Sequence, residues 1–230
     1  MSTAPKTWRI SVIIPTLNEA PWLAATLAAI PRHEVAEVIV ADGGSHDRTV
    51  EIARNYGAAT VASLPGRGPQ QNVGASLASG EILLFLHADT LLPPGFSRDI
   101  ATTLAAPGVV AGAFRLAIAD QRAGLRVVEF FANLRAGWLG LPYGDQALFL
   151  RAADFQALGG YAGIPLFEDA ELVRRLKKRG AIRLTASSVR TSARRWQRLG
   201  ILRTTVRNQL LLLGFLLGVS PLRLARWYRR

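Results

Sequence analysis

Three aspartates of this chain stand where a predicted strand or helix ends or begins: Asp42, Asp89 and Asp169. The apolar run before His87 and Asp89 is too short for a helix and is bounded by turn residues, which is typical of a strand buried on both faces. Ligands bind at the carboxyl ends of strands in open α/β sheets, so the position of Asp89 suits ligand binding. Alternatively, Asp89 is a turn residue, because aspartate is favoured in loops beside proline and glycine.

The second aspartate, Asp42, follows another apolar run and precedes Gly43 and Gly44. Two glycines allow a sharp turn and a close approach of the backbone to a ligand. The simpler alternative is an ordinary strand-to-helix turn in which Ser45 or Asp47 caps the next helix.

A phosphate site is indicated by Arg67, which lies in the segment LPGRGPQQNVG before a predicted helix. A guanidinium and the free backbone N–H groups of a helix start could meet a phosphate there. The segment matches neither the P-loop nor the dinucleotide-binding fingerprint, so it identifies no nucleotide by itself.

Glu168 and Asp169 open the segment EDAELVRRLKKRG, which has acids in its first turn, bases in its last turn and glycine beyond. This pattern stabilises a helix through the helix dipole and C-capping without any function. A chemical role for the two acids therefore needs support from the other motifs.

The first half of the chain alternates strand-like and helix-like segments, which predicts an α/β fold with a parallel sheet and right-handed crossovers. Strands are expected at 9–17, 37–41, 60–64 and 81–86, and helices at 20–30, 45–57 and 70–80. In the less regular second half, strands are expected at 109–118 and 145–150, and helices at 125–140 and 168–180.

Positive charge gathers at the C-terminus. Residues 1–171 hold 12 Lys+Arg and 16 Asp+Glu, whereas residues 172–230 hold 16 Lys+Arg and no acid. This asymmetry implies an anionic partner, which could be a nucleic acid, a membrane surface or a phosphorylated substrate. The lack of cysteine excludes disulfides and thiolate metal sites, and Pro15 interrupts the only apolar run near the start, so a cytoplasmic protein without an export signal is expected.

The tail from Arg190 predicts an amphipathic helix with a cationic face, because Leu199, Leu202, Val206, Leu210 and Leu213 recur every three or four residues. Its most apolar part, 210–219, is about half the length needed to cross a bilayer. Flanking arginines and aromatic residues favour a helix that lies in the interface of an anionic membrane. Alternatively, the leucines pack on the rest of the chain or on a second subunit. Nucleic-acid binding is not expected, because the leucines are too continuous for a solvated binding helix.

The motifs occur in an order that resembles one known family. PTLNE, then DGGS after the second strand, then an aspartate that ends a later strand, then ED at a helix start resemble family 2 glycosyltransferases of the GT-A fold, over roughly residues 10 to 180. FLHADT, YGDQ and TSARRW look most similar to a small bacterial branch often found beside radical-SAM and selenium-related genes. The resemblance implies a Rossmann-like, mostly parallel sheet flanked by helices.

The resemblance also implies transfer of a sugar from a nucleotide-sugar to an acceptor hydroxyl, usually with inversion. In that case the nucleoside would be held by Pro15, Leu17, Glu19 and Asp42. Arg67 would lie near the base or the diphosphate. Asp169, beside Glu168, would be the general base that takes the proton from the attacking hydroxyl.

By the same resemblance, Asp89 would coordinate Mg²⁺ or Mn²⁺, which neutralises the charge of the leaving diphosphate. The family generally has aspartate where this chain has His87, and imidazole is a ligand for Mn²⁺ but a poor one for Mg²⁺. His87 would face the same side as Asp89 if the strand continued. Either His87 contacts ribose or metal, or Asp89 acts alone with modest metal affinity, or His87 is a buried structural residue.

Two further segments are expected near the substrate. YGDQALFL resembles the segment that lines the acceptor side in relatives, so Asp145 and Gln146 are candidates for substrate contact, with a turn entering a strand as the alternative. Arg194, Arg195 and Trp196 resemble part of the arginine-tryptophan motif of processive members and are candidates for diphosphate or lipid-phosphate contact. The full processive pattern and its transmembrane helices are absent from this sequence.

The sequence thus predicts a GT-A catalytic domain at 1–189 and a basic amphipathic helical extension at 190–230. The expected function is an inverting, metal-dependent glycosyltransferase, peripheral at the inner face of the cell membrane and acting on a lipid-linked or amphipathic acceptor. The competing hypothesis is a non-catalytic, membrane-associated nucleotide-sugar binding protein. The sugar, the nucleotide base and the oligomeric state, including a homo-oligomer, are left open.

Overall fold

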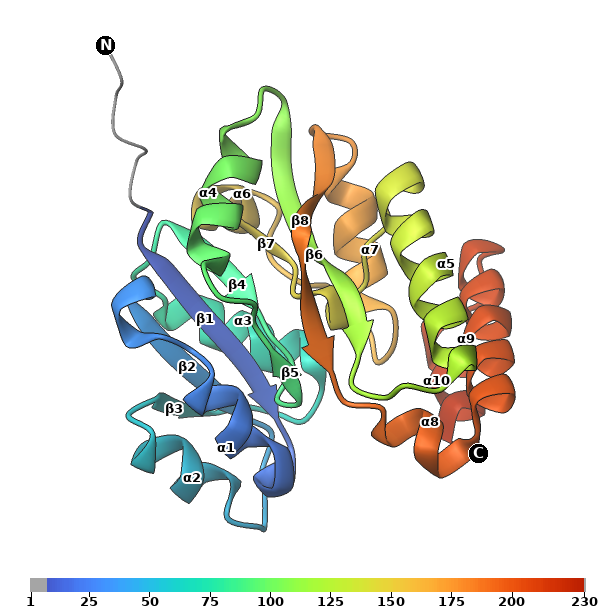
Figure 1. Cartoon of the computed structure of the whole chain (residues 1–230), viewed down its shortest axis with the longest axis horizontal. Helices are drawn as coiled ribbons and strands as arrows, with labels where there is room; N and C mark the ends of the chain where they lie inside the picture. The colour runs from blue at the N-terminus through green and yellow to red at the C-terminus, as the bar shows by residue number, and fades with distance from the viewer. Residues whose placement is uncertain (1–7, 230) are drawn as a thin grey trace.

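A single mixed sheet organises the chain. The structure is a computed structural model and describes residues 8–229. Its 8-stranded sheet has the order β3-β2-β1-β4-β7-β6-β8-β5 and is curled, with helices on both faces and along one edge (Figure 1). The strands are β1 Ile10–Thr16, β2 Glu37–Asp42, β3 Ala59–Ala62, β4 Ile82–Phe85, β5 Thr90–Leu91, β6 Val109–Ile118, β7 Phe149–Arg151 and β8 Ala181–Thr191.

The N-terminal half of the sheet is parallel, as the alternating pattern predicted. Strand β1 pairs in parallel with both β2 and β4, and β2 pairs in parallel with β3. In the second half β6 and β8 are parallel, whereas β7 runs antiparallel to both β4 and β6, and β5 runs antiparallel to β8. The carboxyl ends of β1, β2 and β4 therefore meet at one edge.

The helices follow the strands in the order that a wound α/β fold requires. They are α1 Ala20–Ala28, α2 Thr49–Asn55, α3 Arg67–Leu77, α4 Phe96–Ala105, α5 Ala123–Leu139, α6 Ala152–Ala157, α7 Glu168–Leu176, α8 Arg194–Leu199, α9 Ile201–Leu216 and α10 Pro221–Arg229, with short 3-10 turns η1 Arg32–Glu34 and η2 Gly144–Gln146.

Strand β4 is buried on both faces, which explains its unbroken apolar sequence. Ile82 and Leu84 join a core with helices α1 and α4, whereas Leu83 and Phe85 join a second core with α3 and α7. The alternation follows from the two-residue period of a strand. The prediction of a doubly buried strand before Asp89 is confirmed.

Helix α5 takes the place of a strand along the open edge of β6. Strand β7 pairs with β6 only near Ala111 and Gly112, so the rest of that edge needs other hydrogen-bond partners. Asn133 of α5 accepts from Leu116 N at 2.8 Å and donates to Leu116 O at 3.0 Å. Glu129 accepts from Ile118 N, and Arg126 donates to Ile118 O. Polar side chains therefore fix α5 to the sheet.

Several sequence predictions of secondary structure were wrong or incomplete. The strand expected at 145–150 is shortened to β7, because η2 occupies residues 144–146. Strand β4 ends at Phe85, so the premise that His87 and Asp89 continue it is also wrong. Helix α2 begins only at Thr49. Elements α4, α6, β5 and β8 were not predicted.

The C-terminal segment is helical but broken. Helix α8 ends at Leu199, and Gly200, with φ of 83°, separates it from α9. The predicted boundary at 190 falls inside β8, and the division into two domains stays a prediction. Among the helices within residues 8–229, none combines the length and the apolarity that spanning a bilayer would require.

Gly112 tests the packing between β6 and β7. A Cβ added there would lie 2.5 Å from Phe149 Cε2 and 2.8 Å from Thr103 Cγ2, so the buried ring would have to shift. We expect Gly112→Ala to lower the free energy of unfolding by about 1–3 kcal/mol through overpacking, measured by urea denaturation. Gly163→Ala is the control, because its added Cβ would meet nothing within 4 Å. Equal stability of the two variants would contradict this packing.

Candidate active site

Asp42 closes the turn that follows β2. Its carboxylate accepts hydrogen bonds from Thr16 Oγ1, Gly44 N, Ser45 N and Ser45 Oγ, at 2.5–3.0 Å. Burial alone would raise the pKa of Asp42, but the hydrogen bonds from Ser45 and Thr16 outweigh it, so the pKa is lowered. The turn role considered for Asp42 is present in the structure.

A buried glutamine joins the carboxyl ends of β1 and β2. Gln70 Nε2 donates to Thr16 O at 2.6 Å and to Ala41 O at 2.8 Å. A Cβ on Gly43 would lie 3.1 Å from Gln70 Nε2, so this glycine leaves room for the amide. Gln70 thus fixes helix α3, which carries Arg67 at its first position, against the two strand ends.

Arg194 connects the loops that follow β1 and β4. Its guanidinium forms two hydrogen bonds with the Glu19 carboxylate, at 2.6 and 2.9 Å, and an ion pair with Asp89 Oδ2 at 2.8 Å. The guanidinium also lies 5.6 Å from the centre of the Trp22 ring. Burial raises the pKa of Asp89, whereas Arg194 opposes this rise. One cation therefore compensates two carboxylates from different strands.

His87 lies in a positively charged environment. Burial lowers its pKa well below the ordinary value, and Arg67, Arg195 and Arg194 lower it further. The imidazole is therefore neutral at physiological pH. Three arginines from α3 and α8 converge electrostatically on one histidine, which is an arrangement suited to an anionic ligand.

Asp169 and His87 both lie close to Gly144 of η2. Asp169 Oδ2 accepts a hydrogen bond from Gly144 N at 2.6 Å, and Asp169 Oδ1 accepts from Ala170 N at 2.7 Å. A Cβ on Gly144 would lie 3.1 Å from His87 Nε2 and 3.2 Å from Asp169 Oδ2. Gly144 therefore lets the backbone of η2 pass between the histidine and the aspartate.

Two further carboxyl groups are poorly solvated. Burial, reinforced by the neighbouring Asp169 charge and opposed by Arg67, raises the pKa of Glu168 to about 7. Burial also raises the pKa of Asp145, while Arg135 opposes that rise, and the buried Asp145 Oδ1 has no hydrogen-bond partner among the described residues. A polar ligand could satisfy this oxygen.

Strained backbone accompanies the candidate residues. Among residues 8–229, the non-glycine residues with positive φ are Asn18, Ala147 and Phe167. Asn18 immediately precedes Glu19, Ala147 immediately follows Gln146, and Phe167 immediately precedes Glu168. Such conformations cost of order 1–3 kcal/mol each and cluster at functional sites, so the strain supports one site at this edge.

Comparison with known sequences decides the family. The model of the family described as "Glycosyl transferase family 2" matches residues 11–158, more than half of the chain. The chain belongs to glycosyl transferase family 2. The more specific bacterial branch is not distinguished by this match.

Curated glycosyltransferases match part of the chain. A validoxylamine A glucosyltransferase of Streptomyces hygroscopicus subsp. jinggangensis is 33% identical over 115 residues, which cover 43% of this chain and 26% of that protein. A PGL/p-HBAD biosynthesis glycosyltransferase of Mycobacterium bovis is 41% identical over 91 residues, which cover 36% of each chain. The match thus spans roughly a third or less of these relatives' own length.

Solved structures confirm the GT-A fold. The S. aureus TarS structure in complex with UDP-GlcNAc has a TM-score of 0.62 at 18% identity and covers 80% of this chain and 58% of that one. The mannosyltransferase PcManGT of Pyrobaculum calidifontis, in complex with GDP-Man and Mn²⁺, has a TM-score of 0.61 at 22% identity. The match covers 82% of this chain and 58% of that one. The predicted mostly parallel, Rossmann-like architecture is therefore confirmed.

The structure brings most of the residues predicted for this family site together. Glu19, Asp89 and Arg194 are in direct contact, and Arg67 and Arg195 act on the same histidine. Pro15 is buried within β1, whereas Leu17 is exposed beyond it. The predicted contacts of Pro15 and Leu17 with a nucleoside stay predictions.

Gln146 and Trp196 are buried away from solvent. Gln146 Nε2 donates to Phe114 O at 3.1 Å, and its Oε1 accepts from Tyr143 N at 3.3 Å, so its amide supports η2 and β6. The Trp196 ring packs with Leu116 and other apolar residues of a core beneath α5. Their predicted substrate contacts stay predictions, and both side chains have structural roles.

A divalent metal fits this site only together with a substrate. Among residues 8–229, no group of three or more His, Asp and Glu side chains is arranged to hold a metal ion. Mg²⁺ is usually held by one or two carboxylates plus substrate phosphates, so Asp89 alone suffices if phosphate oxygens complete the shell. His87, two residues before Asp89 in the chain, is neutral, and its imidazole nitrogen suits Mn²⁺ better than Mg²⁺.

Sequence reasoning missed Thr16, Gln70 and Gly144. Thr16 and Gln70 act through hydrogen bonds between segments 26 to 54 residues apart, which no local pattern reports. Gly144 stands inside the motif YGDQ, so the motif itself could have indicated it. The need for glycine appears only once His87 and Asp169 are placed around it.

The raised pKa of Glu168 makes stability depend on pH. Its pKa is about 7 in the native state but near the ordinary 4.5 in the unfolded chain, so native protein binds more protons between these values. The free energy of unfolding therefore falls as pH rises through this window. We expect the free energy of unfolding of Glu168→Gln relative to that of wild type to rise by about 1–2 kcal/mol between pH 5 and pH 8, measured by urea denaturation.

The control is Glu51→Gln, because Glu51 is exposed on α2. Its pKa is lowered by the neighbouring Arg48, so Glu51 is ionised at both pH values and the stability of this variant relative to wild type is expected to be the same at pH 5 and pH 8. A Glu168→Gln variant whose stability relative to wild type is the same at both pH values would show that Glu168 is ionised throughout.

Proposed function

We propose that this family 2 protein transfers a sugar from a nucleoside-diphosphate sugar to an acceptor hydroxyl. The observation that carries the proposal is the shared Arg194, which joins Glu19 after β1 and Asp89 after β4 at the carboxyl edge of the sheet. Ligands of open α/β sheets bind at this edge. The names of the relatives, which include glucosyltransferases and structures with UDP-GlcNAc or GDP-Man, support the same class of donor.

The donor nucleoside lies over the ends of β1 and β2 in this proposal, near Pro15, Leu17, Glu19 and Asp42. Because four hydrogen bonds already hold the Asp42 carboxylate in the turn, its contribution is mainly to shape that turn. The diphosphate lies among Arg67, Arg194 and Arg195, whose combined charge compensates it.

Mg²⁺ or Mn²⁺ would be held by Asp89 and diphosphate oxygens, with His87 as an additional nitrogen donor. The metal supplies Lewis-acid stabilisation of the charge that develops on the leaving diphosphate. In its absence Arg194 provides the countercharge for Asp89 and opposes the rise in its pKa that burial causes. Arg194 is then positioned to contact the phosphates.

Asp169 acts as the general base, with inversion at the anomeric carbon. The hydrogen bond from Gly144 N orients its Oδ2 beside His87. Burial and the Asp169 charge raise the pKa of the neighbouring Glu168 to about 7, so Glu168 holds a proton more readily than an ordinary glutamate. Asp145 would contact the acceptor, and this is supported by its buried Oδ1, which has no hydrogen-bond partner within residues 8–229.

The acceptor is lipid-linked or amphipathic, and the protein works at the inner face of the cell membrane. This part of the proposal rests on the acid-free segment 172–230 and on the exposed leucines of α9, among them Leu202, Leu210 and Leu213. Membership of the radical-SAM and selenium-associated branch is part of the same proposal. A homo-oligomer that covers these leucines is the alternative arrangement.

Donor binding can be measured by thermal unfolding with UDP, GDP, dTDP or CMP, each with Mg²⁺, Mn²⁺ or EDTA. A nucleotide at 100 times its Kd stabilises the native state by about 2.7 kcal/mol, which raises the Tm by roughly 5–11 °C for a chain of this size. We expect one nucleoside diphosphate to produce this shift, and EDTA or Asp89→Asn to reduce it. A folded protein without any shift would contradict the donor site.

Catalysis by Asp169 can be separated from binding. We expect Asp169→Asn to lower kcat by roughly 10²- to 10⁴-fold, because the acceptor loses its general base, while the nucleotide-dependent Tm shift stays within error. Asp154→Asn is the control, since Asp154 lies on α6 and pairs with Arg151 at 3.9 Å. A wild-type protein that binds donor yet transfers sugar to no acceptor would instead favour the non-catalytic binding protein.

A further inference from the structure

The C-terminal helices α8 and α9 hold several buried polar atoms without a partner. Of the six side-chain atoms that are buried and unpartnered within residues 8–229, four lie in these helices. They are Trp196 Nε1, Thr204 Oγ1, Thr205 Oγ1 and Arg207 Nε. Buried polar groups are nearly always paired, so this concentration indicates that α8 and α9 bind a polar ligand.

Arg207 lies on the face of α9 that is turned toward the rest of the chain. Thr204, Arg207 and Leu211 follow one another at three- and four-residue spacing and so share one face of the helix. Thr204 is fully buried, and Leu211 is buried as well. Phe215, the next residue in this series, stacks on Phe167 at the start of α7. The inner face of α9 therefore leads toward the candidate active site.

Two arginines from different helices converge on one aromatic ring. The guanidinium carbon of Arg207 lies 5.0 Å from the ring centroid of Tyr228 in α10, and that of Arg195 in α8 lies 5.8 Å from it. Helices α8, α9 and α10 lie together in Figure 1. Within residues 8–229 neither guanidinium pairs with a carboxylate, and residues 172–230 contain no acid. Two half-buried cations at one ring without a countercharge favour an anionic ligand.

Arg195 also faces the candidate active site. Burial lowers the pKa of His87, and Arg195 is among the arginines that lower it further. Burial raises the pKa of Asp145, and Arg195 is among the arginines that oppose this rise. Because Asp145 is proposed to contact the acceptor, Arg195 connects the acceptor side of the site to Arg207.

The donor alone does not account for all of these cations. The diphosphate site proposed above uses Arg67, Arg194 and Arg195 and gives no role to Arg207. A nucleotide-sugar carries one negative charge on each of its phosphates, so three arginines and a divalent metal already exceed its charge. The surplus of positive charge is better matched by a second anion.

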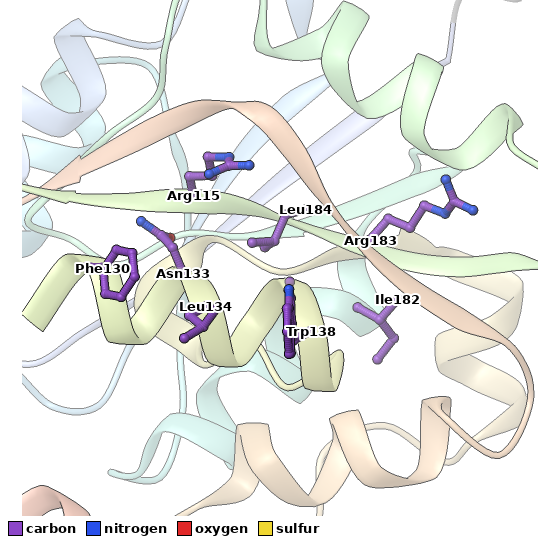
Figure 2. Close-up of a pocket in the computed structure, with 9 residues that line it drawn as sticks. Arg115, Phe130, Asn133, Leu134, Trp138, Ile182, Arg183 and Leu184 are labelled. Carbon is purple, nitrogen blue, oxygen red and sulfur yellow. The ribbon is translucent and has the colours of Figure 1, made fainter.

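The groove between α5 and β8 offers an anion no comparable countercharge (Figure 2). Ile182 and Leu184 are the β8 side chains that face α5, whereas Arg115 and Arg183 point away from it. An anionic ligand would therefore be attracted to the arginine pair and not to this groove.

We propose that the acceptor carries a phosphate monoester, which binds between Arg195 and Arg207 beside the Tyr228 ring. Arginine suits this group, because its planar guanidinium donates two parallel hydrogen bonds to phosphate oxygens. The phosphate end then holds the acceptor hydroxyl toward Asp145 and Asp169. This inference rests on the proposed glycosyl transfer and deepens it by naming the class of acceptor.

Phosphate binding is measured with the donor site filled. At constant ionic strength, inorganic phosphate should raise the Tm of the full chain even with Mg²⁺ and a saturating concentration of the nucleoside diphosphate that gives the largest shift. Arg207→Gln should weaken phosphate binding about tenfold or more, because a charged hydrogen-bond donor is lost. The matched control is Arg203→Gln, which removes the same charge from an exposed position of α9 and should bind phosphate as wild type does.

A purely structural role for Arg207 predicts a different result. If Arg207 only held α9 against Tyr228, Arg207→Gln would lower the Tm without any ligand and leave phosphate affinity unchanged. We expect the reverse, with an unliganded Tm within about 2 °C of wild type, because a guanidinium without a carboxylate partner adds little stability. Arg207→Lys keeps the charge and should weaken phosphate binding less than Arg207→Gln does. Equal phosphate affinity of wild type and both variants would overturn the proposal.

Two phosphate esters identify the source of the phosphate. Decyl phosphate, used below its critical micelle concentration, carries a hydrocarbon chain, whereas glycerol phosphate does not. If both depend on Arg207, tighter binding of decyl phosphate supports a lipid phosphate, and tighter binding of glycerol phosphate supports a soluble phosphate ester.

The nucleotide-dependent Tm shift separates this inference from glycosyl transfer. If saturating nucleoside diphosphate abolishes phosphate binding, the arginine pair serves only the donor and the proposal is overturned. A nucleotide shift without any phosphate shift also overturns it, but leaves glycosyl transfer standing. A phosphate shift without any nucleotide shift would contradict glycosyl transfer itself, and with it an acceptor at this site.

Discussion

The structure depends on how several carboxyl groups are tolerated at one poorly solvated edge of the sheet. Unpaired buried charges are strongly unfavourable, so each group needs its own compensation. Asp42 receives hydrogen bonds from its own turn, Asp89 shares Arg194 with Glu19, and Asp169 accepts the Gly144 N–H. Burial instead raises the pKa of Glu168 to about 7, so this group is protonated more readily than an ordinary glutamate. The different solutions give neighbouring acids different chemical properties.

This compensation ties distant parts of the chain together. Glu19 and Arg194 are 175 residues apart, and their two hydrogen bonds fasten the start of α8 to the loop after β1. Ser192 N also donates to Asp89 O at 3.1 Å, so the end of β8 is held to the same loop by its backbone. The C-terminal segment therefore contributes to the candidate site, although the family match ends at residue 158.

The sequence predicted those features that local patterns encode. Alternating apolar runs gave the parallel half of the sheet, and the short motifs placed Asp42, Asp89 and Asp169 near one edge. Strand β8 was missed because its exposed residues, such as Arg183 and Arg190, resemble a basic tail rather than a strand in a sheet. The pairing of Arg194 with Asp89 was also beyond reach, because a contact across 105 residues leaves no periodic signal.

Asp169, the proposed base, lies near a side-chain contact between the start of α7 and helix α9. Phe167, with φ of 65°, immediately precedes Glu168 and stacks on Phe215 of α9, with ring centroids 5.0 Å apart. A strained conformation persists only where its surroundings hold it, and here the surroundings include α9. If α9 lies on a membrane, the stacking of Phe215 on Phe167 connects the docked helix to the start of α7. The orientation of Asp169 then depends on the surface that carries the acceptor.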